Sequence, residues 1–297
     1  MKKLVYNIYV NVLKGEVFLA ALVLEGGTFR PIFSCGIMDA LLDNNINFDY
    51  VIGVSAGISH GFSYVSRQRG RAHDIITNYR HDKRYIGMRN YLSDRSLFGL
   101  KFAYETMGNE IYPFDWDSFL SNPAKVRVGV TNAHTGEIEY LDGKKTDDRY
   151  DMLKATCALP LAFPAIKIGD KEYFDGGITD SIPAKKAYED GNEKMLIVHT
   201  RTDDYVKKLS MGVKVISKLY RKKYPKMAEA MLKRHIMYNE QLEYCRKLES
   251  EGKAIILRPN RETQIKSFEK DLDKMETIYQ YGYRLVIENL DKIKGLF

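Results

Sequence analysis

Cysteine is scarce in this chain, and its three cysteines stand far apart in the sequence. Cys35, Cys157 and Cys245 form no C-x-x-C pair, so we expect reduced thiols and no structural zinc site. The six histidines are scattered and form no H-E-x-x-H motif, which disfavours a catalytic metal. These absences predict a protein that needs neither a metal ion nor another cofactor.

Long apolar runs are also missing, because no segment approaches the roughly 20 consecutive apolar residues of a bilayer-spanning helix. The N-terminus begins like a signal peptide, with two lysines ahead of apolar residues. Asn7, Asn11 and Lys14 interrupt those apolar residues, and no small-residue cleavage site follows them. We therefore interpret residues 1–16 as a non-cleaved extension and expect a soluble, cytoplasmic protein.

The composition of the chain is that of a globular protein. Apolar residues make up 44% of the 297 residues and charged residues 29%, which suffices for one large α/β domain with or without an appendage. The formal net charge of +7 favours anionic partners, either a membrane surface or nucleic acid. A solvated basic surface would explain the same charge, so the charge alone does not decide.

The strand pattern predicts a mostly parallel sheet. Residues 17–24 form a continuous apolar run, which is typical of a strand buried on both faces. A glycine turn, a helix, a second strand at 50–54 and another helix follow, an order that implies right-handed crossovers. Further strands are predicted at 125–131, 137–141, 165–168, 172–174, 194–200 and 254–259.

A serine stands in a turn between a strand and a helix. Gly53, Ser55 and Gly57 form the pattern G-x-S-x-G, which lifts a serine hydroxyl out of such a turn. The glycines allow the tight backbone and the close approach of neighbouring segments. An ordinary glycine-rich turn is the alternative interpretation.

A nucleophilic serine would need a base and donors for an oxyanion, because its hydroxyl is a poor nucleophile at neutral pH. The candidate donors are the backbone N–H groups of Gly26, Gly27 and Thr28, where the first strand ends and a helix begins. Phosphate binding is the rival interpretation of this turn. Residues 25–31 match neither G-x-G-x-x-G nor a P-loop, so we rank nucleotide binding low.

Asp175 is the candidate base, since it lies between an apolar strand and two glycines, at a strand end where sites in open α/β sheets gather. A type I′ hairpin turn is the alternative for this Asp-Gly pair. A carboxylate with the reference pKa of about 3.9 is a weak base, so Asp175 would have to be partly desolvated. His199 ends a later strand and leaves open a Ser–Asp–His triad.

Three motifs, in this order along the chain, resemble the patatin-like phospholipase family. They are Glu25–Arg30, Gly53–Gly57 and Asp175–Gly177. Residues 155–164 resemble the family's segment upstream of the aspartate. The resemblance covers roughly residues 20–187, and three ordered motifs are far more specific than one.

The resemblance implies a three-layer α/β/α sandwich that hydrolyses lipid acyl esters, of phospholipase A or esterase type, through an acyl-enzyme and without a metal. Ser55 would be the nucleophile, and Asp175 would be the general base that later activates the deacylating water. The backbone amides of Gly26, Gly27 and Thr28 would form the oxyanion hole. The other motif residues are Arg30, Gly53, Gly57, Gly176 and Gly177.

Two positions depart from the family pattern. Thr28 and Pro31 stand where the family usually has glycine. Threonine disfavours positive φ, so we expect the turn to be shifted there. These departures leave open a second function, a catalytically weak or silent protein that binds a membrane surface or RNA with the same fold.

The composition shifts near residue 204 toward lysine-rich helices, and no linker separates this part. We predict a patatin-like catalytic domain at 17–200 and a mostly helical extension at 201–297 that packs on it. The basic stretch 207–226 is expected to meet an anionic membrane surface peripherally through its charges. We expect its apolar residues to pack on the domain instead. These residues are Val213, Ile216, Leu219 and Tyr220.

A second basic stretch, residues 67–95, interleaves arginines with tyrosines. Such a surface could grip RNA, but no recognised nucleic-acid module surrounds it. A lid or a surface for anionic head groups fits the stretch at least as well. We therefore expect a lipid or acyl-ester partner and no nucleic acid.

Overall fold

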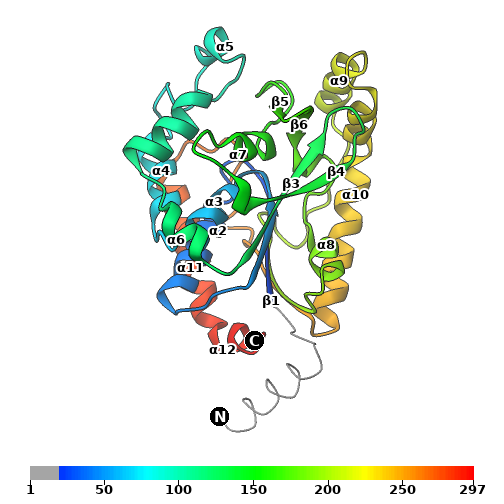
Figure 1. Cartoon of the computed structure of the whole chain (residues 1–297). Coiled ribbons are helices and arrows are strands. Elements are labelled where there is room, and N and C mark those ends of the chain that lie inside the picture. Colours follow the sequence, from blue (N-terminus) through cyan, green and yellow to red (C-terminus); the bar gives the residue numbers. More distant parts are fainter. Residues whose placement is uncertain (1–19) are drawn as a thin grey trace.

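The computed structural model describes residues 20–297. The predicted extension at 1–16 and the predicted start of the first strand lie outside the described residues. An eight-stranded sheet forms the middle of the molecule, with strand order β5-β6-β3-β2-β1-β7-β8 and with β4 paired to β3 (Figure 1). The strands are β1 (Ala20–Leu24), β2 (Tyr50–Val54), β3 (Lys125–Asn132), β4 (Ile138–Asp142), β5 (Ile166–Ile168), β6 (Lys171–Asp175), β7 (Lys194–Val198) and β8 (Ala254–Leu257).

Five of these strands run parallel, as the apolar runs predicted. β2 and β7 flank β1, β3 pairs with β2, and β8 pairs with β7, all in parallel. β4 and β6 pair with β3 antiparallel, and β5 pairs with β6 antiparallel. The prediction of a mostly parallel central sheet is confirmed.

Helices cover both faces of the sheet, and the alternation along β1 shows why its sequence is apolar throughout. Leu22 and Leu24 belong to one buried cluster, whereas Ala21 and Val23 belong to another. Successive side chains of a strand point to opposite faces, so a strand covered on both sides has no polar position. Figure 1 shows the two helical layers on either side of the sheet.

The first helical layer consists of α2 (Ile32–Asp43), α3 (Ser55–Val65), α4 (Arg71–Tyr79), α6 (Trp116–Ser121) and α11 (Leu272–Glu288). The second layer is formed by α8 (Ala184–Glu189) and α10 (Pro225–Ser250). The remaining helices are α5 (Asn90–Ser93), the π-helix η1 (Lys101–Ile111), α7 (Asp151–Thr156), α9 (Met211–Tyr220) and α12 (Leu290–Lys294). The three-layer prediction is confirmed.

The part of the chain after residue 200 is mostly helical and shares the core of the preceding part. β8 extends the central sheet. Met275 and Ile278 of α11 belong to the same buried cluster as Leu22 and Leu24 of β1. The division into a domain at 17–200 and an extension at 201–297 remains a proposal. Among residues 20–297, no helix combines the length and the apolar character needed to cross a membrane.

Candidate active site

Ser55 is the first residue of α3 and follows β2 without a loop. Its φ of 55° lies in the left-handed region, which non-glycine residues rarely adopt. Such strain at a strand-to-helix turn is the backbone signature that the G-x-S-x-G motif predicted. The side chain is buried but faces two cavities.

Asp175 lies at the end of β6 and contacts the serine directly. The Ser55 hydroxyl donates a hydrogen bond of 2.7 Å to Asp175 Oδ2, and the Gly177 amide donates one of 2.8 Å to Oδ1. A Cβ at Gly176 would lie 2.2 Å from the carbonyl oxygen of Gly129, so only glycine lets the chain leave β6 here. Gly176–Ile178 form a 3₁₀ turn, so the alternative of a type I′ hairpin at this Asp-Gly pair is wrong.

The environment of Asp175 makes its carboxylate more basic than a free aspartate. Burial raises the pKa of Asp175, although the Ser55 hydroxyl, the charge of Arg234 and the Gly177 amide oppose that shift. Desolvation disfavours the charged carboxylate, so the group gains affinity for a proton. This is the partial desolvation that a base toward serine requires.

The glycine turn after β1 lies against the serine. A Cβ at Gly26 would be 2.7 Å from Ser55 Cβ, so a larger residue would displace the serine. Within residues 20–297, the amides of Gly26, Gly27 and Thr28 donate no hydrogen bond to the protein. These three donors therefore remain available beside Ser55.

The turn does not shift to keep Thr28 out of the left-handed region, contrary to our expectation, and this threonine carries the strain itself. Its φ is 60°, so the threonine itself takes the left-handed conformation that a glycine would adopt more easily. Pro31 precedes α2 directly, a position where the missing N–H costs no helical hydrogen bond. Both departures from the family pattern are thus accommodated in the backbone.

Two charged residues of the turn fasten it to neighbouring elements. The Glu25 carboxylate accepts hydrogen bonds from the Thr200 amide (2.6 Å) and from the Tyr238 hydroxyl (2.8 Å). Arg30 Nε donates to Thr200 Oγ1 at 3.3 Å, and Arg30 also contacts the Ser267 hydroxyl. The turn is therefore fixed to the end of β7 and to α10.

Thr156 is a site residue that the sequence did not reveal. The Ser55 amide donates to Thr156 Oγ1 at 2.8 Å, and that hydroxyl donates to the Gly129 carbonyl at 2.6 Å. The threonine thus satisfies the serine's own amide and holds the turn against β3. It lies within the family-like segment 155–164, but the pattern there assigns it no role.

His199 takes no part in this arrangement. It forms a hydrogen bond with neither Ser55 nor Asp175, and no described residue is a hydrogen-bond partner of its buried Nε2. Burial lowers the pKa of His199 to about 4, so the ring is neutral at pH 7. The structure does not assemble the Ser–Asp–His alternative.

An apolar cavity of about 110 Å³ opens at Ser55 between α3, α4 and η1. Its apolar lining includes Phe29, Phe62, Ala72, Ile75, Ile76, Phe98, Ala103, Met107, Phe114, Leu153 and Phe163. Because these side chains are apolar, they offer a ligand an apolar contact surface beside Ser55.

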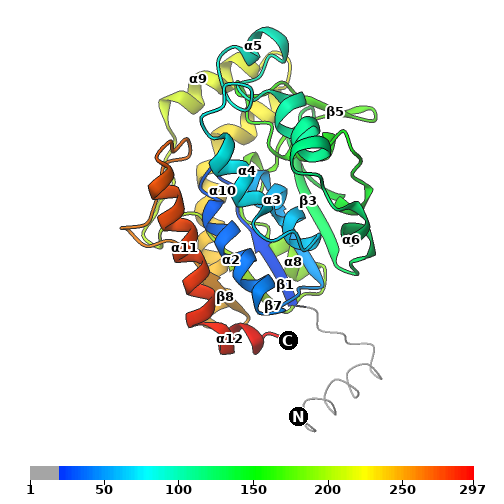
Figure 2. The same cartoon turned by 90° about the vertical axis from the view of Figure 1, so that its left-hand side faces the viewer.

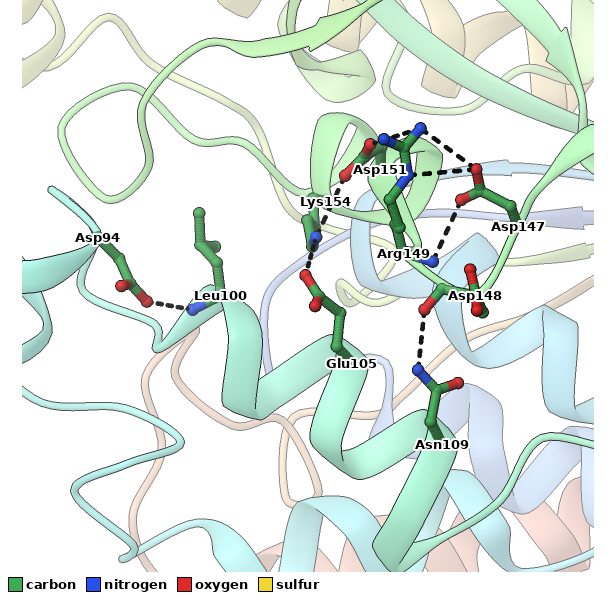
Figure 3. Close-up of polar contacts among 9 residues, drawn as sticks. All are labelled: Asp94, Leu100, Glu105, Asn109, Asp147, Asp148, Arg149, Asp151 and Lys154. Atoms are coloured by element: carbon green, nitrogen blue, oxygen red, sulfur yellow. Dashed lines mark hydrogen bonds and ion pairs between the residues drawn. The ribbon is translucent and has the colours of Figure 1, made fainter.

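The π-helix η1 forms one wall of that cavity and is fastened by polar contacts (Figure 3). Lys154 Nζ on α7 lies 2.7 Å from Glu105 Oε1 on η1, and this ion pair ties η1 to α7. Lys154 Nζ also lies 3.1 Å from Asp151 Oδ1 within α7. Asn109 donates to the Asp148 carbonyl at 2.9 Å, and the Leu100 amide donates to Asp94 at 2.6 Å. These contacts hold the wall at both ends and in the middle.

A second cavity of about 170 Å³ also reaches Ser55, and it contains Asp175 and the glycine turn. Its lining is polar and includes the cationic side chains Arg30, Arg201, Lys207 and Arg234. Thr28, Ser55 and Leu159 line both cavities. The serine therefore stands where an apolar and a cationic space meet.

Comparison with known proteins places these motifs in a family. The model of the patatin-like phospholipase family matches residues 22–188, and a model described as a domain of unknown function (DUF6363) matches residues 224–297. The solved structure of VipD from Legionella pneumophila aligns with 92% of this chain and 67% of VipD, with a TM-score of 0.52 and 14% identity. At that identity the likeness concerns the fold alone.

Two curated proteins are similar in sequence. YjjU of Escherichia coli (strain K12), described as uncharacterized, is 24% identical over 194 residues, 61% of this chain and 51% of YjjU. The lysophospholipase NTE1 of Yarrowia lipolytica is 23% identical over 223 residues, 70% of this chain and 14% of NTE1. The chain thus spans about half of YjjU and a small part of NTE1. Since the family model covers more than half of the chain, from residue 22 to residue 188, this protein belongs to the patatin-like phospholipase family.

Proposed function

We propose that this protein hydrolyses acyl esters of lipids with Ser55 as nucleophile and Asp175 as general base. The observation that carries the proposal is the 2.7 Å hydrogen bond between the serine hydroxyl and a buried carboxylate. Family membership and the similarity to a lysophospholipase support a lipid ester as the substrate class. Reactivity comes from pairing a weak nucleophile with a base of raised pKa.

The reaction would proceed through an acyl-enzyme. Asp175 takes the proton of Ser55 Oγ as that oxygen attacks the ester carbonyl, and the amides of Gly26, Gly27 and Thr28 donate to the resulting oxyanion. The carbon–oxygen bond to the alcohol then breaks, and the alcohol leaves with the proton from Asp175. Asp175 next takes a proton from water as the water oxygen attacks the acyl-serine carbonyl. The bond from the acyl carbon to Ser55 Oγ then breaks, Asp175 returns the proton to Oγ, and the fatty acid leaves.

The apolar cavity would hold the acyl chain of the substrate. Its aromatic and aliphatic side chains begin at Ser55, so a chain bound there places its ester carbonyl beside the serine. Each methylene moved from water into such a cavity contributes about 0.8 kcal/mol. This binding gives a preference for esters whose acyl chains fill the cavity.

The test is hydrolysis of a panel of acyl esters and phospholipids by wild type and by Ser55→Ala. We expect turnover by the wild type and its loss in the variant, with unchanged circular dichroism spectra. Equal turnover by both proteins would contradict the proposal. If the folded wild type cleaves none of the esters, the alternative of a catalytically silent binding protein takes its place.

We also propose that the end of the molecule near α5 and α9 meets anionic lipid surfaces. Both helices lie at the same end in two perpendicular views (Figures 1 and 2). Val213, Ile216 and Tyr220 pack against the core as expected. The expectation that Leu219 packs on the domain is wrong, because this residue is 63% exposed. Met211 and Val215 on the same helix are also exposed, at 70% and 55%.

The outer face of α9 therefore carries apolar residues as well as lysines, which would add apolar contact to the electrostatic attraction of an anionic membrane. Co-sedimentation with neutral and anionic vesicles at low and high salt tests this. We expect stronger binding to anionic vesicles that weakens with salt. Equal binding to both vesicle types would contradict the electrostatic part.

RNA is less well supported as a partner of the basic stretch 67–95. Arg80 lies over the Phe29 ring at 4.3 Å and Arg84 lies over Phe102 at 4.4 Å. Arg71 donates two hydrogen bonds to the Tyr112 carbonyl. Arg71 and Arg80 are therefore engaged within the protein, which leaves fewer arginines of this stretch to contact phosphates.

A further inference from the structure

We propose that the cationic cavity beside Ser55 is a subsite for a phosphomonoester head group, so that the preferred substrates are lysophosphatidic and phosphatidic acids. We call Arg30, Arg201, Lys207 and Arg234 the cationic subsite. This inference rests on the proposed function, because it assigns the head group of the ester that Ser55 attacks. Arg201, Lys207 and Arg234 lie beyond residue 188, outside the part of the chain that the phospholipase family model matches.

The four cations converge from separate segments of the chain. Arg30 follows the glycine turn after β1, and Arg201 follows β7. Lys207 precedes α9, and Arg234 lies on α10. All four line the same cavity as Ser55 and Asp175. A head group there would be within one lipid molecule's reach of the ester at the serine.

Within residues 20–297, none of the four forms an ion pair with a carboxylate. Arg201 lies over the Tyr205 ring at 4.4 Å, and Lys207 Nζ lies 4.8 Å from the Tyr238 ring centre. Arg234 donates to the Gly177 carbonyl. The nearby Glu25 already accepts hydrogen bonds at both oxygens. Half-buried cations without a carboxylate partner are costly, so an anionic ligand would relieve a penalty that the fold maintains.

The cations also destabilise one another. Burial, followed by the charges of Arg234 and Arg30, lowers the pKa of Lys207 to about 7. Burial and the charge of Arg201 lower the pKa of Arg30 to about 10. These shifts are consistent with the shared cavity that the four side chains line, where a bound anion would interact with all of them.

The charge balance favours a phosphomonoester over a zwitterionic head group. Three arginines and Lys207, which is partly protonated at pH 7, share the cavity with the carboxylates of Glu25 and Asp175, and this leaves an excess of positive charge. A phosphomonoester carries about −1.5 to −2 charges at pH 7 and neutralises that excess. A phosphocholine head group has no net charge. Its ammonium would be repelled, and the faces of Tyr205 and Tyr238 that could hold it already lie under Arg201 and Lys207.

Binding to the full-length Ser55→Ala variant tests the subsite without turnover. The probes are hexanoyl-glycerol 3-phosphate, hexanoyl-glycerol 3-phosphocholine, glycerol 3-phosphate and inorganic phosphate, measured by calorimetry below micellar concentrations. We expect the phosphomonoester lipid to bind at least about tenfold more tightly than the phosphocholine lipid, because the phosphodiester has less negative charge to accept charge-assisted hydrogen bonds and its ammonium is repelled. Equal affinity for the two lipids would overturn the proposal. Equally tight binding of inorganic phosphate would identify a free-phosphate site instead.

Matched variants locate the effect. Adding Lys207→Met should weaken binding of the phosphomonoester lipid about tenfold or more, and Lys233→Met should not. Lys233→Met makes the same lysine-to-methionine replacement on the exposed surface, where the Lys233 side chain is 68% accessible and pairs with Glu229. Equal effects of the two variants would overturn the assignment, because they would show a general loss of positive charge.

Hydrolysis separates this proposal from the proposed function. In the otherwise native protein, Lys207→Met should lower kcat/KM for the phosphomonoester lipid about tenfold more than it lowers kcat/KM for p-nitrophenyl hexanoate. Equal losses on both esters would overturn the subsite but leave the hydrolase intact. If the wild type cleaves neither ester, the proposed function fails, and the binding measurements still decide the subsite.

Discussion

The two cavities that meet at Ser55 differ in chemistry and in origin. The apolar cavity is lined entirely by residues between Thr28 and Phe163, within the part of the chain that the phospholipase family model matches. The cationic cavity takes Arg201, Lys207 and Arg234 from later segments. The part of the chain that the family model matches thus surrounds one side of the serine, and the C-terminal part supplies three of the four cations on the other.

This difference separates two kinds of recognition. Apolar contact scales with buried area and has little directional preference, so the first cavity would select for chain length. Charged groups recognise sign and geometry, so the second would select for the head group. According to our proposals, the ester that is cleaved lies between the apolar and the cationic cavity. Substitutions can therefore alter one cavity without changing the other.

The largest effect is expected where the two cavities meet. Asp175→Asn should reduce kcat by about 1,000-fold or more on every ester, because serine and base act as one unit. Initial rates and circular dichroism would check this. His199→Ala is the matched control and should retain activity within about threefold, since a dyad needs no imidazole. Turnover near the wild-type rate in Asp175→Asn would rule out the dyad.

The second prediction fills the apolar cavity alone. Ala103→Trp, on η1, should lower kcat/KM for long acyl chains about 100-fold, since displacing four methylenes forfeits about 3 kcal/mol. Activity on p-nitrophenyl acetate should change less than about threefold, because that acyl group does not reach the wall. A uniform loss across all chain lengths would contradict an acyl-binding role for this cavity.

The sequence predicted the residues around Ser55 better than it predicted the cationic subsite. Continuous apolar runs identified the buried strands, and the glycines around Ser55 identified the turn, because both are local consequences of sterics and burial. Asp175 could be found because it ends a strand. These features depend on neighbours in the chain, which a single sequence displays.

The cationic subsite depends on tertiary placement. Lys207 is half-buried and Lys208 is exposed, although both stand in one lysine-rich stretch. Nothing local distinguishes them, because the direction of each side chain is set by the packing of the loop before α9. Likewise, the pattern could not show that Thr28 itself would adopt φ of 60°.

The third prediction concerns pH and the base. Because burial raises the pKa of Asp175, the acid limb of kcat/KM should lie above the reference value of about 4 and fall about tenfold per pH unit below it. Native Asp175 binds its proton more tightly than the unfolded chain does. The free energy of unfolding of wild type, relative to Asp175→Asn, should therefore decrease as pH rises from about 4 through the raised pKa. A limb at or below pH 4 would contradict the desolvated base.

The smallest effect is expected at Thr28. Thr28→Gly should keep kcat within about threefold of the wild type and should be more stable than Thr28→Ala by about 1 kcal/mol, because glycine adopts positive φ without strain. Thermal unfolding of the two variants and initial rates would check this. A large loss of rate in Thr28→Gly would instead give the threonine side chain a role in binding substrate.

Covalent labelling asks directly whether Ser55 is the nucleophile, because it requires no knowledge of the natural substrate. The protein is treated with an alkyl fluorophosphonate, and the modified peptide is identified by mass spectrometry. We predict one adduct, on Ser55, that is absent in Ser55→Ala and forms much more slowly in Asp175→Asn. An adduct on another residue, or none in a preparation that hydrolyses esters, would contradict it.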